Sequence, residues 1–281
     1  MKIAKTVADL RNAINTAKAD GTIGFVPTMG ALHNGHISLV KRCRKENDTV
    51  VVSVFVNPTQ FNDKNDLKNY PRTEEADAKL LSDAGCDILF LPTAEEMYPE
   101  EDTRRFVFGE LEQVMEGPLR PGHFNGVAQV VSKLFNFVSP TNAYFGEKDF
   151  QQLAIIRKMV EDMKYNINIV GCEIFRAPNG LALSSRNALL SKEQLETAPI
   201  IHMTISEATK LAKIADVEHV KNWVKEQIES CKGMKVDYFE IVNAKTLQPI
   251  DSFNDACQKR GCIAVKVGDI RLIDNIAFLI K

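Results

Sequence analysis

Two histidines one helical turn apart, His33 and His36, are the first side chains in this sequence that could do chemistry. They lie in VPTMGALHNGHISLV, after a loop containing Gly30 and on either side of Gly35. If a helix begins near Asn34, its free N–H groups and its dipole favour an anion there, and two imidazole donors would suit a polyphosphate. The pair could instead cap the helix. A metal site is the weakest interpretation, because zinc needs further Cys or His ligands at suitable spacing.

Two further stretches carry polar side chains that suit a small ligand. FVNPTQF places Asn57 and Gln60 directly after an apolar run, and an amide both donates and accepts hydrogen bonds. LRPGHFNGV places Arg120 and His123 around a Pro-Gly turn, with a helix expected to start around Asn125. Taken singly, either stretch could equally be a surface loop.

The stretch YFGEKDFQQL offers groups for a nucleotide. Gly146 ends an apolar run, Lys148 could contact a phosphate, and Asp149 could accept hydrogen bonds from ribose hydroxyls. Gln152 lies one turn beyond Asp149, on the same side of the helix that should follow. The alternative is a capped, solvated helix start.

The last stretch, NGLALSSRNALLS, contains Ser184, Ser185 and Arg186 on a Gly-containing loop. Two hydroxyls and a guanidinium can hold a polyphosphate through charge-assisted hydrogen bonds. The tripeptide alone is common by chance. Five such stretches at the ends of predicted strands indicate one shared site more strongly than any single stretch does.

Short apolar runs separated by amphipathic segments must position these groups. Runs that are apolar at nearly every position predict strands buried on both faces, as in a parallel sheet covered by helices. The sequence therefore predicts a Rossmann-like, doubly wound α/β fold. The strands are expected at 22–28, 49–56, 87–92, 142–145 and 166–175, and helices at 37–47 and 74–85.

The pattern changes after about residue 186. Two helices, at 192–214 and 217–231, are followed by strands at 236–244 and 262–268. Helices followed by strands indicate a smaller α+β domain. We therefore expect a ligand-binding domain over 1–186 and a small C-terminal domain over 187–281, without a long linker.

Composition narrows the class of protein. A formal net charge of −2 over 281 residues gives no global attraction for nucleic acid or an anionic membrane. Six scattered cysteines without a C-x-x-C motif indicate ordinary buried thiols in a reducing compartment. The start, MKIAKTVADLRNAI, resembles neither a signal peptide nor an anchor, and the longest strongly apolar run, 50–56, is too short to cross a bilayer. A cytoplasmic protein is expected.

Taken in order, the five stretches resemble the pantothenate synthetase (pantoate–β-alanine ligase) family, over about residues 22 to 190. The H-x-G-H portion also resembles the wider nucleotidyltransferase group. The resemblance implies an ATP-dependent ligase that forms a pantoyl adenylate from (R)-pantoate and then pantothenate from β-alanine, releasing pyrophosphate and AMP. It also implies a homodimer and Mg²⁺ carried mainly by the ATP phosphates.

The same resemblance implies roles for individual residues. His36 would act as proton donor and, with His33, Lys148 and Arg186, would form the catalytic set. Pantoate would be held by Gln60 and Gln152, with Arg120 and His123 nearby. The remaining nucleotide contacts implied are Met29, Gly30, Ala31, Leu32, Asn34, Gly35, Gly146, Glu147, Asp149, Phe175 near adenine, Leu183, Ser184 and Ser185.

This chain departs from the family pattern at two places on one loop. Leu183 stands where a Met is expected, and Ala177-Pro178-Asn179 stands where an acid-plus-Asp pattern is expected. Two other functions are compatible with the fold. One is a nucleotidyltransferase whose product keeps the nucleotide, and the other is a non-catalytic nucleotide- or RNA-binding module. The net charge and the intact His, Lys and Arg set disfavour the module.

Overall fold

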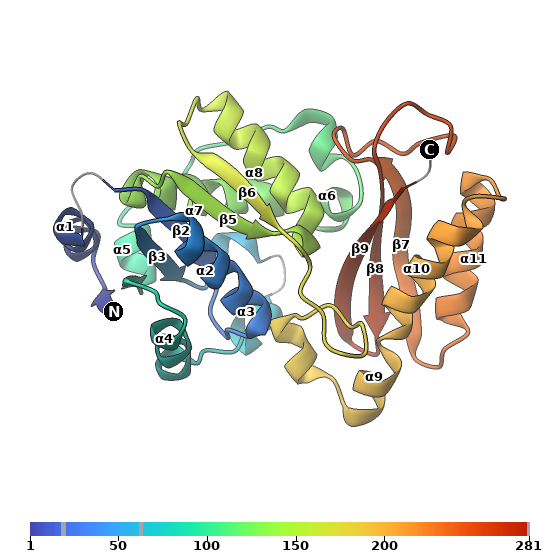
Figure 1. Ribbon diagram of the computed structural model, residues 1–281, viewed down its shortest axis with the longest axis horizontal. Coiled ribbons are helices and arrows are strands. Elements are labelled where there is room, and N and C mark those ends of the chain that lie inside the picture. Colours follow the sequence, from blue (N-terminus) through green and yellow to red (C-terminus); the bar gives the residue numbers. More distant parts are fainter. Residues whose placement is uncertain (18–20, 62–63, 280–281) are drawn as a thin grey trace. The chain divides into compact units, whose positions relative to one another are not determined.

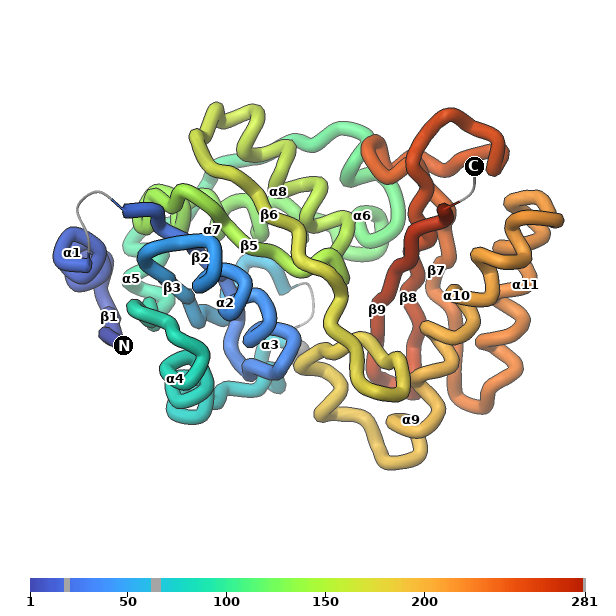
Figure 2. The backbone as a smooth tube through the Cα atoms, in the orientation of Figure 1, coloured from blue at the N-terminus to red at the C-terminus, as the bar shows by residue number. Residues whose placement is uncertain are grey.

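The computed structural model describes residues 1–17, 21–61 and 64–279. Contacts group this part of the chain into two compact units. Unit 1 comprises Met1–Phe108, Leu119–Glu147 and Gln152–Glu173, and unit 2 comprises Gly109–Pro118, Lys148–Gln151 and Ile174–Lys281. The division into domains at residue 186 stays a prediction. Figures 1 and 2 follow the chain through both units.

Unit 1 is built on a six-stranded sheet in the order β1-β4-β3-β2-β5-β6, in which every paired strand is parallel. The predicted doubly wound α/β fold is therefore confirmed. All five predicted strands are present, and β1 is an additional one. Their bounds are β1 Lys2–Ala4, β2 Ile23–Thr28, β3 Thr49–Val54, β4 Ile88–Phe90, β5 Asn142–Gly146 and β6 Asn168–Cys172.

Helices cover both faces of this sheet, as its continuous apolar strands require. Val50 and Val52 of β3 pack with Val40 of α2 (Asn34–Glu46) and Leu81 of α4 (Glu74–Asp83). On the opposite face, Phe25 of β2 meets Phe135 of α7 (His123–Val138) edge to face. The other helices of the chain outside the C-terminal part are α1 Val7–Ala17, α3 Lys64–Asn69, α5 Ala94–Met97, α6 Glu116–Leu119 and α8 Phe150–Asp162.

Unit 2 contains a three-stranded antiparallel sheet in the order β7-β8-β9, with bounds Met234–Asn243, Lys259–Val267 and Ile270–Phe278. Its helices are α9 (Lys192–Thr197), α10 (Ile200–Leu211) and α11 (Val217–Glu229). The single helix predicted over 192–214 is wrong: Pro199 lies between α9 and α10, and its ring cannot continue the first helix. Strand β9 was not predicted.

The cysteines do not all have the environment expected from the sequence. All six are free thiols, but only Cys43, Cys86, Cys172 and Cys262 are buried, whereas Cys231 and Cys257 are half-exposed. Desolvation by burial raises the pKa of Cys43, Cys86 and Cys262 to about 12. The buried thiols are therefore packing residues.

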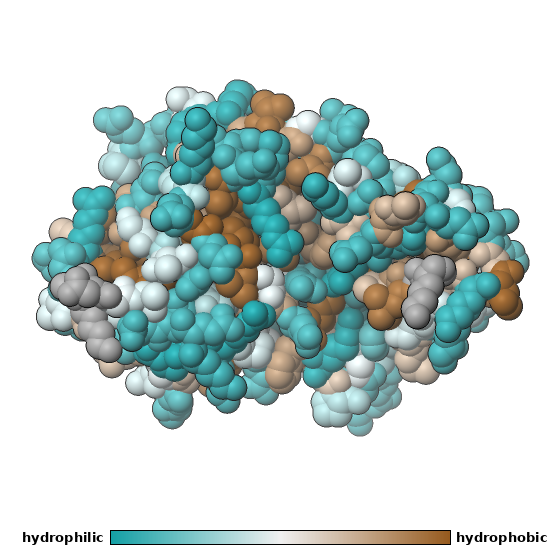
Figure 3. Space-filling model, turned by 45° about the horizontal axis from the view of Figure 1, so that its top comes forward, coloured by the Kyte–Doolittle hydropathy of each residue, from teal (hydrophilic) through white to brown (hydrophobic). Residues whose placement is uncertain are grey.

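The surface suits a chain with many charged residues. On the face shown in Figure 3, hydrophilic side chains cover most of the area, with hydrophobic patches between them. None of the described helices combines the length and the apolar character that crossing a membrane requires.

Candidate active site

The loop after β2 ends in a reciprocal cap made by the two predicted histidines. His33 is the N-cap of α2, and its Nδ1 accepts a hydrogen bond from the backbone N–H of Gly35 at 3.1 Å. The Nδ1 of His36 accepts from the backbone N–H of His33 at 3.3 Å. The helix starts at Asn34, as predicted. Helix capping and ligand binding were alternatives at the sequence level, and the cap is present.

The cap also determines which ring nitrogen carries the proton. A neutral imidazole has one N–H, and a nitrogen that accepts a hydrogen bond cannot carry it. Since Nδ1 is the acceptor in both rings, the proton of each neutral ring lies on Nε2. His33 and His36 are therefore Nε2–H donors at the N-terminus of a helix, where an anion is favoured.

A buried carboxylate shapes the backbone that leads into this cap. Asp77 of α4 is 1% exposed, and its two oxygens accept from the N–H groups of Ala31 at 2.9 Å and Leu32 at 2.8 Å. Gly30 and Ala31 are both left-handed, with φ of 83° and 50°, and successive N–H groups in such a turn form a concave anion site. The Asp77 carboxylate of the same chain occupies this anion site. The role of Asp77 was not predicted.

Gln60 lies in a second module, on the turn η1 (Pro58–Gln60) after β3. Its Nε2 lies 2.9 Å from the Sδ of Met29, which follows β2. Its Oε1 accepts from the Nδ2 of Asn57 at 3.2 Å, and the Oδ1 of Asn57 accepts from the hydroxyl of Tyr98 at 2.8 Å. Both ends of the Gln60 amide are thus oriented. Desolvation by burial raises the pKa of Tyr98, so it stays a hydroxyl donor.

His123 supports the same turn from α7. It is 5% exposed, and its Nδ1 lies 2.9 Å from the backbone oxygen of Gln60. Helix α7 begins at His123, two residues before the predicted start at Asn125. Gly126 allows the helix to approach, because a Cβ there would lie 2.5 Å from the backbone oxygen of Thr59. His123 thus positions Gln60 within unit 1.

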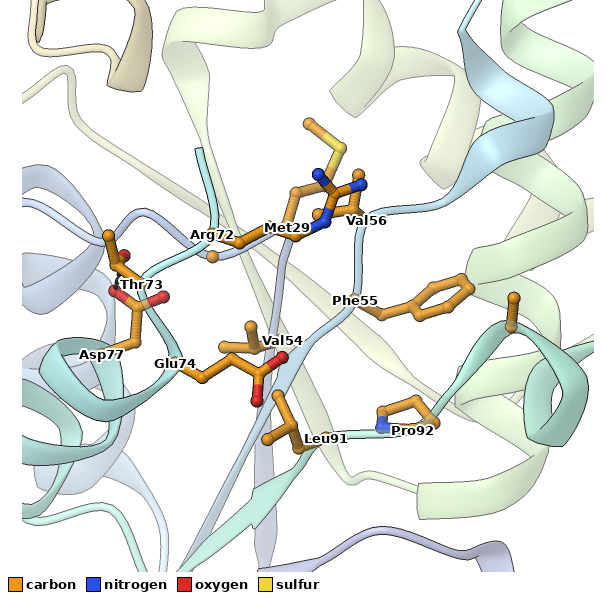
Figure 4. A pocket seen from close by; sticks show the side chains of 12 residues that line it. Met29, Val54, Phe55, Val56, Arg72, Thr73, Glu74, Asp77, Leu91 and Pro92 are labelled. Carbon is orange, nitrogen blue, oxygen red and sulfur yellow. Dashed lines mark hydrogen bonds between the residues drawn. The ribbon is translucent and has the colours of Figure 1, made fainter. Parts of the chain in front are cut away.

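A cavity of about 220 Å³ opens at the carboxyl ends of β2, β3 and β4. Its lining includes Met29 and Gly30, with Val54 and Leu91 forming an apolar part. Figure 4 shows Asp77 beside Thr73 at one side of it, where the Thr73 hydroxyl donates to the Asp77 carboxylate at 3.1 Å. This edge is where ligands bind in open α/β sheets.

The remaining predicted residues of unit 1 lie at or near element ends. Gly146 is the last residue of β5, and Glu147 follows it. Gln152 is half-buried in the first turn of α8, and Arg120 is half-buried just before α7. Unit 1 thus places Met29 and His123 against Gln60, on the turn after β3. It also holds His33 and His36 at the start of α2.

Unit 2 carries the other predicted nucleotide contacts. The ammonium of Lys148 pairs with the carboxylate of Asp149, with Nζ 3.1 Å from Oδ2. The predicted phosphate and ribose contacts therefore form an ion pair with each other. Phe175 is 42% exposed, which is unusual for a phenyl ring and leaves its surface open to a flat ligand.

The Ser-Ser-Arg stretch of unit 2 follows a narrow hairpin. Backbone hydrogen bonds join Ala177 to Leu181 and Phe175 to Leu183. Where an acid-plus-Asp pattern was expected, the Oδ1 of Asn179 accepts from the N–H of Leu181 at 3.2 Å, as an Asp carboxylate could. The departure therefore preserves the turn.

The residues that follow this hairpin form a short helical turn. Ser184 caps η4 (Ser185–Leu189), with its hydroxyl accepting from the N–H of Arg186 at 3.2 Å. Leu183, Ser184, Ser185 and Arg186 are all half-buried. Unit 2 thus holds these four residues on one ordered segment.

Comparison with known proteins connects both units to one family. The family profile described as Pantoate-beta-alanine ligase matches residues 2–277. A protein of Bacteroides fragilis called pantothenate synthetase is 55% identical over 279 residues, which cover 99% of each chain.

Two solved structures of this kind of enzyme match this chain over nearly its whole length. Pantothenate synthetase from Thermus thermophilus is 44% identical, with a TM-score of 0.92 and 99% of each chain covered. Pantoate-beta-alanine ligase from Francisella tularensis, solved with β-γ ATP and β-alanine, is 37% identical, with a TM-score of 0.84 over 100% of this chain and 99% of the other.

Proposed function

This chain belongs to the pantoate–β-alanine ligase family, and from that premise we propose how its residues divide the reaction. The enzyme condenses (R)-pantoate with β-alanine, using ATP. A pantoate carboxylate oxygen attacks the α-phosphorus, the bond to the β-phosphate oxygen breaks, and pyrophosphate leaves. The β-alanine amine then attacks the acyl carbon, the acyl–phosphate bond breaks, AMP leaves, and the amine gives up a proton. The match over residues 2–277 carries this conclusion.

We propose that unit 1 supplies the donors and the pantoate contacts. The Nε2–H groups of His33 and His36 would stabilise charge on the ATP phosphates, which is the form of catalysis that preorganised donors provide. The Gln60 amide, oriented by Asn57 and Met29, would hold pantoate together with Gln152. Such alignment supplies much of the rate when no enzyme group becomes covalently attached.

Unit 2 would supply the cations and the adenosine contacts. Lys148 would exchange its bond to Asp149 for an ATP phosphate, and Asp149 would then accept from the ribose hydroxyls. Ser184, Ser185 and Arg186 would contact the polyphosphate, and Phe175 the adenine. The Francisella tularensis relative, solved with β-γ ATP and β-alanine, supports ATP and β-alanine as ligands of this chain.

We further propose that Mg²⁺ enters with ATP. Among the described residues, no three His, Cys, Asp or Glu side chains converge into a group that could hold a metal. Mg²⁺ keeps several waters and commonly binds through substrate phosphates, where it would neutralise phosphate charge.

Substrate-omission assays test the function. With ATP and pantoate but no β-alanine, we expect one equivalent of pyrophosphate per site, and adding β-alanine should then give steady release of free AMP. A product that keeps the nucleotide would instead identify the alternative nucleotidyltransferase. ATP binding without any pyrophosphate release would identify a binding module.

Two features remain proposals: a lid, suggested by the lability of the adenylate in water, and a homodimer, implied by the family resemblance. Residues 187–281 would form a lid domain that protects the water-sensitive adenylate, and the chain would form a homodimer. A decrease in the radius of gyration on adding ATP and pantoate would support the lid. Sedimentation at micromolar concentration should give about twice the chain mass, and a monomer there would exclude the dimer.

A further inference from the structure

Two adjacent residues of β9, Asp274 and Asn275, hold two separate segments of unit 2. They are 5% and 2% exposed. Successive side chains of a strand point to opposite faces, so one strand can reach a different segment on each side. Both segments contain residues that we propose to contact ATP.

Asn275 holds the backbone of Lys148. Its Nδ2 donates to the carbonyl oxygen of Lys148 at 3.0 Å. Its Oδ1 accepts from the Nε of Arg260 at 2.7 Å, which sets the direction of the amide. The segment that carries the Lys148 ammonium is thus attached to the sheet through its main chain, which leaves the side chain to serve ATP.

Asp274 holds the hairpin that leads to Ser184. Its two oxygens accept from both terminal nitrogens of Arg176, at 2.6 Å and 2.8 Å. Arg176 also donates to the carbonyl oxygen of Gly180 at 3.1 Å, and it pairs with Ala182 across the hairpin. A bidentate, partly buried pair of this kind fixes orientation as well as distance.

A shared backbone link joins these two attachments. The N–H of Asn275 donates to Oδ1 of Asp274 at 2.7 Å. The Asp274 carboxylate is therefore bonded to the backbone of the residue whose side chain holds Lys148. The spacing between the Lys148 segment and the Ser184–Arg186 segment is set within unit 2 by this one strand.

We propose that Asp274 and Asn275 are positioning residues for adenylate formation, acting through Lys148 and the Ser184–Arg186 segment. The proposal rests on the function given above. Pyrophosphate must be held only while the bond to the α-phosphorus breaks. Attack of β-alanine on the finished adenylate releases AMP and involves no pyrophosphate. Misplacement of the phosphate contacts should therefore slow the first half-reaction selectively.

The test compares the two half-reactions in Asn275→Ala and Asp274→Asn. We expect the single-turnover rate of pyrophosphate release from ATP and pantoate to fall by about 10- to 100-fold, the range that a displacement of about 1 Å can cause. With saturating synthetic pantoyl adenylate and β-alanine, the rate of pantothenate formation should stay within about twofold of the parent enzyme, because saturation offsets weaker adenosine contacts of Asp149 and Phe175 and no pyrophosphate is bound.

Asn243→Ala is the matched control. The Oδ1 of Asn243 caps a turn after β7 through the N–H groups of Lys245 and Thr246, so its loss perturbs unit 2 without touching either segment. If Asn275→Ala does not fold, Asn275→Asp replaces it, since it keeps an acceptor for Arg260 and puts a carboxylate oxygen where the donor to the Lys148 carbonyl was. Arg176→Gln combined with Asp274→Asn should cost no more than the worse single change, because both changes disrupt the same Arg176–Asp274 pair.

Equal loss in both half-reactions, or a rate of pyrophosphate release like that of Asn243→Ala, would overturn the positioning role. Failure of the parent enzyme in both half-reactions would instead refute the proposed function. The two failures are therefore distinguishable in the same set of assays.

Discussion

His33 and His36 direct their Nδ1 atoms to backbone N–H groups of the same helix start, with their ring centroids 4.1 Å apart. Each ring is thereby fixed in one tautomer before any ligand arrives. This relationship reconciles helix capping with phosphate binding, because the cap uses Nδ1 and the proposed catalytic donor is Nε2–H.

Replacing His36 with Ala should lower turnover by about 10²- to 10³-fold, the loss expected when one preorganised donor to developing charge is removed. The measurement is single-turnover pyrophosphate release with saturating ATP and pantoate. A decrease below tenfold would mean that His36 serves only the cap.

Replacing His33 should separate its two roles. His33→Ala removes the acceptor for the Gly35 N–H and should lower the free energy of unfolding by about 1 kcal/mol, whereas His33→Asn keeps a good N-cap and most of that stability. Chemical denaturation measures the difference. Both variants should lose adenylate formation, and full activity in His33→Asn would contradict a donor role for the ring.

Gly126→Ala should raise the KM for pantoate. Alanine is the better helix former by about 1 kcal/mol, but its Cβ would lie 2.5 Å from the Thr59 carbonyl oxygen, so α7 or η1 must move. Because the backbone of Gln60 is bonded to His123 of that helix, the Gln60 amide should be displaced. Steady-state kinetics and a thermal melt give both effects, and an unchanged KM would show that Gln60 is held independently of α7.

Thiol labelling should separate the cysteines by burial. In the native protein at pH 8, Cys231 and Cys257 should react, giving two thiols per chain, and all six should react after unfolding. Burial and a raised pKa keep Cys43, Cys86 and Cys262 protonated and covered. Fast labelling of more than two thiols would indicate that a buried site opens readily.

Acid should destabilise the protein partly through His202. Desolvation, followed by the nearby Arg176 cation, lowers its pKa below the ordinary value of 6.5, and Asp274 opposes this only in part. The unfolded chain then binds the proton more readily, so stability present above about pH 6.5 is lost as the pH falls through the folded pKa. His202→Gln should flatten the decrease in stability, measured by urea denaturation, below that pH. An unchanged pH profile would rule His202 out.

The sequence predicted the parallel sheet well because its strands are uninterrupted apolar runs, as in Val50–Val52. The division of the pattern over 192–214 into two helices was readable but overlooked, because the ring of Pro199 cannot continue the first helix. Strand β9 was missed because Arg271, Asp274 and Asn275 interrupt its apolar residues. Each has partners that only the folded unit 2 supplies.

The residues of the candidate site fall into a predicted and an unpredicted group for a physical reason. His33, His36 and Gln60 carry local signals, namely spacing and position after a strand. Asp77 has no such signal, because a carboxylate in the first turns of an acidic helix usually faces solvent. Its role depends on a pairing with Ala31 and Leu32 that lie far away in sequence.

Strand β9 also bears on how the protein is made. The sheet of unit 1 is complete once Cys172 has left the ribosome, but in unit 2 Glu116, Lys148 and Arg176 all have partners on β9. Chains fold from the N-terminal side as they are synthesised, at about 5–20 residues per second. The wait runs from 98 residues, between Arg176 and Asp274, to 155 residues, between Glu116 and Arg271. At that speed it lasts roughly 5–30 s. Until β9 emerges, a nascent chain would hold its histidine cap without the main-chain anchor of Lys148, so ATP turnover should begin only after synthesis has passed Asn275.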